Sequence, residues 1–151
     1  MPVFLPALIC DTGLLSRVMI ARSPFNEAYE AVLTQYTPVI STAVYVELQH
    51  WLQIQRGAIE QPISRAEYDR HRHRLDSYVV LNSDGVSRQA MAVARRWPDT
   101  GVGDCYTIAT ALVFDVPVFT LNPKHFQRVN SLLLYKPENY KNLLASVKRK
   151  A

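Results

Sequence analysis

Four oxygen-bearing side chains lie beside apolar runs at widely separated points of the sequence: Asp11, Glu47, Asp104 and Asn122. A carboxylate near a hydrophobic core is costly unless a cation or hydrogen bonds satisfy it. Carboxylates that are brought together repel and raise one another's pKa, and a divalent ion removes that repulsion. Ligands that offer only oxygen suit Mg²⁺ or Mn²⁺ rather than zinc, and such an ion orients a phosphodiester and activates a water.

Each of the three acids also has a structural alternative. Asp11 and Asp104 stand where helices are expected to begin, so either could serve as an N-cap. Glu47 falls on the apolar stripe of a helix, three residues after Val44 and four before Trp51, so it should point inward or toward a cleft. It could instead pair with an interior arginine or lie at the edge of the surface. The convergence of three acids at one place favours a metal site.

Apolar runs and helical periodicities alternate along the whole chain. Strands are expected at residues 7–10, 38–41, 77–81 and 117–121, with a possible short strand at 132–134; helices are expected from about residue 13 and over 24–36, 42–55, 62–76, 86–97 and 104–114. This alternation predicts an α/β fold, a single three-layer α/β/α domain over 1–151 with a central parallel sheet of four to five strands. Residues 141–151 are interpreted as a polar, Lys-rich tail. Ligands of such sheets bind beyond the carboxyl ends of the strands, where Asp11 and Asn122 fall.

The composition is that of an ordinary globular protein. The chain has 151 residues and a net charge of +4, which fits an anionic partner such as nucleic acid without requiring one. Its two cysteines, Cys10 and Cys105, lie in or beside apolar runs and predict buried free thiols in a reducing cytosol. The sequence contains neither a signal-peptide pattern nor an apolar run long enough to span a membrane, so a soluble, cytoplasmic protein is expected.

The segment SRAEYDRHRHRLD predicts a strongly basic helix. Arg65, Arg70, Arg72 and Arg74 could contact RNA phosphates there, and a solvated helix face explains the same residues equally well. The two interleaved histidines point to different sides of a helix and do not form a metal pair.

The stretch ALICDTGLL contains Asp-Thr-Gly, the signature of retroviral-type aspartic proteases. Those enzymes are mostly β and need a later apolar pair followed by glycine. Here the segment after Gly13 reads as a helix, and the last of the five glycines is Gly103. The protease interpretation is therefore rejected.

Three segments together resemble the PIN domain, and in particular the VapC-type toxins of bacterial toxin–antitoxin pairs. They are ICDTGLLS, VYVELQHW and GDCYTIATALVFDVPVFTLNPKHFQRV, which occur in the family's order across nearly the whole chain. The resemblance maps the metal-binding acids to Asp11, Glu47 and Asp104, the fourth metal position to Asn122, and supporting polar neighbours to Thr12 and Thr120.

The resemblance implies a Mg²⁺- or Mn²⁺-dependent endoribonuclease that acts on RNA such as tRNA, forms a homodimer and pairs with a cognate antitoxin protein. Two residues depart from the family pattern. Gly13 stands where Asn or Ser is frequent, and Asn122 replaces an acid found in many members, so its amide oxygen adds no negative charge. A weaker second ion or a one-ion site is expected. The alternative is a PIN-like module with weakened catalysis that binds RNA or a partner protein.

Overall fold

The strands of the structure, a computed structural model that describes residues 4–20 and 24–148, form one parallel sheet. They are β1 (Ala7–Cys10), β2 (Thr37–Ser41), β3 (Val79–Leu81) and β4 (Val118–Phe119), in the order β3-β2-β1-β4. The α/β class and the parallel sheet predicted from the sequence are confirmed, with four strands in the sheet.

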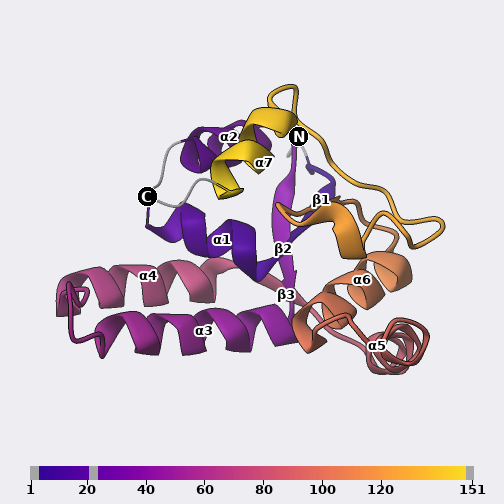
Figure 1. Cartoon of the computed structure of the whole chain (residues 1–151), viewed down its shortest axis with the longest axis horizontal. Helices are drawn as coiled ribbons and strands as arrows, with labels where there is room; N and C mark the ends of the chain where they lie inside the picture. The colour runs from indigo at the N-terminus through magenta and orange to yellow at the C-terminus, as the bar shows by residue number, and fades with distance from the viewer. Residues whose placement is uncertain (1–3, 21–23, 149–151) are drawn as a thin grey trace.

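Helices connect these strands: α1 (Thr12–Met19), α2 (Phe25–Leu33), α3 (Thr42–Arg56), α4 (Arg65–Ser77), α5 (Asp84–Arg96), α6 (Val102–Phe114) and α7 (Tyr140–Lys148), with a short 3-10 helix η1 at Pro123–His125. Serine side chains cap three of them, because the hydroxyls of Ser41, Ser64 and Ser83 accept hydrogen bonds from the first turns of α3, α4 and α5. Figure 1 shows α1, α2 and α7 on one side of the strands, with α5 and α6 on the other.

Alternating residues of the strands build a separate core on each face of the sheet. Leu8 and Cys10 of β1 pack with side chains of α1, α2, α3 and α7, whereas Ile9 packs with α5 and α6. Helices therefore cover both faces, which confirms the three-layer prediction. Cys10 and Cys105 are buried free thiols, as predicted, and burial raises the pKa of both.

The C-terminal segment differs from its predicted form. Residues 140–148 are the helix α7, not a polar tail, because Tyr140 and Leu143 are buried in the core beneath it. Polar and basic residues separate these anchors, and the sparse apolar positions conceal the helical period. The Arg149 and Lys150 end of the predicted tail lies outside the described residues.

Three strand predictions are also longer than the strands observed. The expected strand at 77–81 is reduced to Val79–Leu81, because Ser77 still belongs to α4. The expected strand at 117–121 is reduced to Val118 and Phe119, which frees Thr120 and Asn122 from the ladder. The possible strand at 132–134 contributes a single bridge, between Leu134 and Val118. Among the described residues, no helix combines the length and apolar character needed to cross a membrane.

Candidate metal and phosphodiester site

The predicted site residues follow the carboxyl ends of the strands. Asp11 comes directly after β1, and Thr120 and Asn122 come just after β4, which is the neighbour of β1 in the sheet. The helices α3 and α6 carry Glu47 and Asp104. The parallel sheet thus gathers side chains that are distant in the sequence at one edge, as the strand–helix alternation predicts.

Asp11 is the buried centre of this arrangement, with a relative exposure of 6%. Its Oδ1 accepts a hydrogen bond from the Leu14 backbone N–H at 3.0 Å, so Asp11 is also the N-cap of α1. Its Oδ2 accepts a hydrogen bond from the hydroxyl of Thr120, whose oxygen in turn accepts the backbone N–H of Asn122 at 3.0 Å. Thr120, which is predicted to support the site, therefore contacts Asp11 directly.

The environment raises the pKa of Asp11 to about 6. Burial is the largest cause, and the negative charge of Asp104 acts in the same direction. The hydrogen bonds from Thr120 and Leu14, together with the positive charge of Arg17, oppose the rise but do not cancel it. The charge on this carboxylate therefore lacks enough compensation from protein groups, which is the condition that a bound cation relieves.

Glu47 lies on the exposed part of α3, so of the two orientations expected for it, inward or toward a cleft, the inward one is wrong. Its carboxylate is nevertheless held at the site, because its Oε1 accepts a hydrogen bond from the Thr12 hydroxyl at 2.8 Å. Gly103 makes the room for it: a Cβ built at Gly103 would lie 2.1 Å from Glu47 Oε1. Glu47 thus occupies space that exists only because residue 103 has no side chain.

Asp104 lies in the first turn of α6, whose N-cap is Gly101, so the N-cap alternative for Asp104 is wrong. Its Oδ2 lies 3.1 Å from Nδ1 of His125. Nε2 of His125 lies 3.9 Å from Asp99, which Arg128 holds through two hydrogen bonds of 3.0 and 3.1 Å. No local spacing in the sequence predicts the contact between His125 and Asp104, which are 21 residues apart.

The arginines of α4 are largely occupied by their own neighbourhood. Arg72 donates to Asp76 at 2.7 Å, Arg65 lies 3.7 Å from Asp69, and the guanidinium of Arg74 stacks 5.4 Å from the centre of the Tyr29 ring. The solvated-face interpretation accounts for these pairs. An RNA contact from this helix, including Arg70, stays a prediction.

The few carboxylates at the site are compatible with the way in which proteins bind Mg²⁺. Within residues 4–20 and 24–148, no three His, Cys, Asp or Glu side chains are grouped closely enough to hold one ion between them. Mg²⁺ usually takes only one or two carboxylates and completes its shell with waters and substrate phosphates. Asp11 and Asp104, which interact electrostatically, match that requirement without a closed protein cage.

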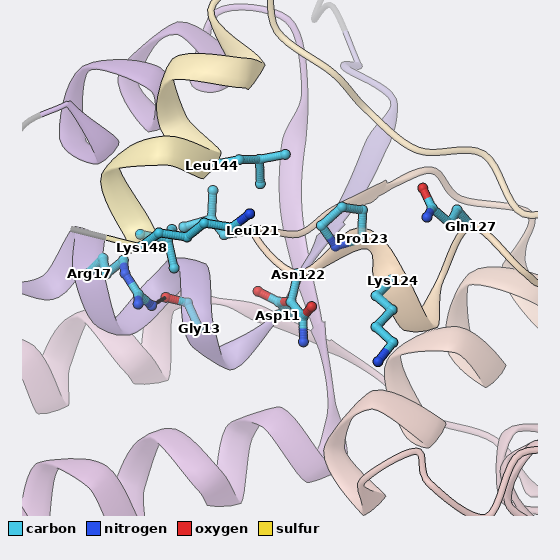
Figure 2. Close-up of a pocket in the computed structure, with 11 residues that line it drawn as sticks. Asp11, Gly13, Arg17, Leu121, Asn122, Pro123, Lys124, Gln127, Leu144 and Lys148 are labelled. Carbon is cyan, nitrogen blue, oxygen red and sulfur yellow. Dashed lines mark hydrogen bonds between the residues drawn. The ribbon is translucent and has the colours of Figure 1, made fainter. Parts of the chain in front are cut away.

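A hollow of about 590 Å³ opens beside Asp11 on the side that faces α7. Its lining includes Arg17, Asn122, Lys124 and Lys148 (Figure 2). A Cβ at Gly13, which also lines it, would meet only ordinary contacts of 3.7 and 3.9 Å. A small side chain at position 13 would therefore fit. Lack of space does not explain why this chain has glycine where Asn or Ser is frequent.

Asp11 generates a prediction about stability in the absence of metal. Because its pKa is raised from 3.8 to about 6, its contribution to stability is complete below pH 3.8 and is lost as the pH rises through about 6. At pH 7.5 in EDTA, Asp11→Asn should therefore increase the free energy of unfolding by up to about 3 kcal/mol. At pH 4 most of this advantage should disappear, leaving about 0.5 kcal/mol. Urea denaturation at both pH values measures it.

The matched control is Glu30→Gln on the exposed face of α2, which should change the free energy of unfolding by no more than about 0.5 kcal/mol at either pH. A stability difference between Asp11→Asn and the wild type that stays constant from pH 4 to pH 7.5 would contradict the assigned shift.

Comparison with known proteins gives a family for this arrangement. The profile of the PIN domain matches residues 8–132, a span that contains Asp11, Glu47, Asp104 and Asn122. Comparison with curated proteins found no match.

Solved structures with similar folds include chains from three bacterial complexes. VapBC2 from Rickettsia felis bound to a DNA fragment from its promoter matches with a TM-score of 0.68 and 15% identity, covering 87% of this chain and 99% of that chain. VapBC-1 from nontypeable Haemophilus influenzae matches at 0.63 and 20% identity, covering 85% and 96%. A toxin–antitoxin complex from Klebsiella pneumoniae matches at 0.60 and 21% identity, covering 83% and 95%.

At these identities the structural matches establish a shared fold, and the profile match extends over most of the chain. The four-stranded parallel sheet, with acids beyond its strand ends, agrees with both findings. The chain belongs to the PIN domain family.

Proposed function

We propose that this protein is a divalent-metal-dependent endoribonuclease and the toxin of a VapBC-type toxin–antitoxin pair. PIN domains are generally nucleases that use divalent metal ions. The observation that carries the proposal for this chain is the buried, poorly compensated carboxylate of Asp11 within electrostatic reach of Asp104. A charge of this kind is maintained at a functional site rather than for stability.

Asp11 and Asp104 would hold the ion, Mg²⁺ or Mn²⁺, with Glu47 and the amide oxygen of Asn122 at its periphery. The bound ion would lower the pKa of a water and stabilise charge on the phosphodiester. Thr120 fixes both Asp11 and the Asn122 backbone, and Thr12 fixes Glu47, so these hydroxyls preserve the orientation of the donors. Asn122 brings no charge, which favours one tightly held ion over two.

The decisive test is cleavage of single-stranded RNA by the purified protein with Mn²⁺ or Mg²⁺, with and without EDTA. Asp104→Asn should lower the rate at least about a hundredfold, because it removes a charge that the ion and the transition state require. Its folding should be unchanged by circular dichroism. Cleavage that persists in EDTA, or equal cleavage by the variant, would refute the nuclease proposal.

A second prediction concerns the space over residue 103. Gly103→Ala adds one methyl group inside α6, where alanine is favoured over glycine by about 1 kcal/mol, so the fold should be retained. The methyl group would displace the flexible end of Glu47, and RNA cleavage should fall about tenfold or more.

Gly101→Ala is the control for this variant, because a Cβ at Gly101 meets nothing within 4 Å. It should retain the cleavage rate of the wild type. Equal rates for the two alanine variants would exclude a role for Glu47 at its observed position.

The toxin assignment, with a cognate antitoxin, RNA such as tRNA as substrate, and a homodimer, extends the resemblance to VapC-type proteins and has a test of its own. Expression of the wild type in bacteria should arrest growth, whereas Asp104→Asn should be tolerated. Harmless expression at high level would count against a toxin and would leave another PIN nuclease possible.

The alternative function is a binding module with weakened catalysis, which the uncharged Asn122 favours. Tight RNA binding without cleavage under any of the metal conditions above would select it. The presence of all three acids argues for catalysis.

A further inference from the structure

The hollow beside Asp11 continues along α7 into a second one. The first has a volume of about 590 Å³ and the second about 700 Å³, and Pro123, Gln127 and Leu144 line both. The two hollows therefore adjoin, and together they form a groove between α7 and the segment that follows β4. We call it the α7 groove; it begins at Asp11 and reaches residues 136–142.

The helix α7 presents different side chains to the core and to this groove. Tyr140 and Leu143 are buried, and the Tyr140 hydroxyl donates to the Thr120 carbonyl oxygen at 2.6 Å, which fixes the helix beside the site. Lys141, Leu144 and Lys148 recur at spacings of three and four residues, so they share one face, and all three line the groove. Lys141 and Lys148 are about 10 Å apart along the helix axis.

The groove is strongly basic for its size. Five cationic side chains line it, compared with two carboxylates, Asp11 and Glu138. The cations are Arg17, Lys124, Lys136, Lys141 and Lys148. In the view of Figure 2, Arg17 and Lys148 lie on one side of Asp11 and Lys124 on the other. Positive charge on both sides of a concave surface concentrates an anionic ligand there.

We propose that the α7 groove binds the phosphate backbone of the RNA strand on one side of the bond that is cut. This inference rests on the proposed nuclease function and goes beyond it, because α7 lies outside residues 8–132, the part of the chain that matches the PIN profile. The helix α7 supplies Lys141 and Lys148, and the groove gives the substrate a direction: from Asp11, past Pro123 and Leu144, along α7.

The chemistry of the lining favours a nucleic acid strand over an acidic peptide. The cations recur along the groove, as a backbone with one phosphate per nucleotide requires. Leu121, Pro123 and Leu144 lie between them and give bases apolar surface to cover. The same groove begins at Asp11, one of the carboxylates that the proposed reaction needs. On the competing basic surface, α4, three of the four arginines are paired within the protein: Arg65 with Asp69, Arg72 with Asp76 and Arg74 with Tyr29.

The test separates binding from cleavage by using Asp104→Asn protein in EDTA and a fluorescein-labelled single-stranded RNA. The groove pair, Lys141→Gln with Lys148→Gln, is compared with an α5 pair, Arg88→Gln with Arg95→Gln, which removes the same charge from exposed positions on the other side of the sheet. The affinity is measured by anisotropy over a series of salt concentrations. A plot of log affinity against log salt has a negative slope. For the groove pair, the magnitude of this slope should decrease by about 1.4, which is about 0.7 for each lost phosphate contact. The α5 pair should leave the slope unchanged.

Equal losses for the two pairs would overturn the proposal in favour of unspecific attraction. An unchanged RNA affinity with lost binding of an acidic antitoxin peptide would overturn it in favour of a peptide site. If the wild type cuts no RNA but the groove pair binds RNA more weakly, the proposed nuclease activity is refuted and RNA binding in the α7 groove is retained. If the wild type cuts RNA and the groove pair binds like the α5 pair, the groove proposal fails and the nuclease proposal stands.

Discussion

A carboxylate that is almost fully buried needs hydrogen bonds, and Asp11 accepts one from its own neighbourhood in the sequence and one from a residue more than a hundred positions away. The backbone of Leu14 supplies one from the start of α1, and the hydroxyl of Thr120 supplies the other from beyond β4. Thr120 is itself tied to Asn122 and Tyr140. The end of the central strand, the start of a helix and the C-terminal helix are thus held by contacts that converge on one side chain, and the charge on that side chain is still incompletely satisfied.

The sequence was informative where local pattern and fold coincide. Short apolar runs followed by polar residues predicted the strands, and parallel topology then requires Asp11 and Asn122 to lie at one sheet edge. The two thiols were predictable from their apolar neighbours. The same logic predicted the helix α3, because its periodicity is local, and Ser41, directly before it, caps it. Family resemblance added the roles of the acids, which no spacing alone supplies.

Other features depend on packing between distant segments and leave little trace in the sequence. The helix α7 packs on the core through Tyr140 and Leu143. Because only these two side chains are buried among lysines and asparagines, the sequence of this segment resembles that of a solvated chain end. The burial of Glu47 was overestimated because an apolar stripe on α3 gives no measure of how far its flank is covered. The contact between His125 and Asp104 arises only when η1 is placed against α6. Long-range contacts of this kind need the folded backbone.

The two outer strands of the sheet differ in how their edges are protected. Val118 of β4 donates its N–H to the carbonyl of Leu133 and accepts the N–H of Tyr135, so the chain itself covers that edge. The other outer strand, β3, leaves Val79 and Val80 half-exposed but has only three residues. At about 3.3 Å per residue it offers an incoming strand roughly 10 Å of ladder, about half of an ordinary strand. Aggregation by strand addition is therefore disfavoured at both edges.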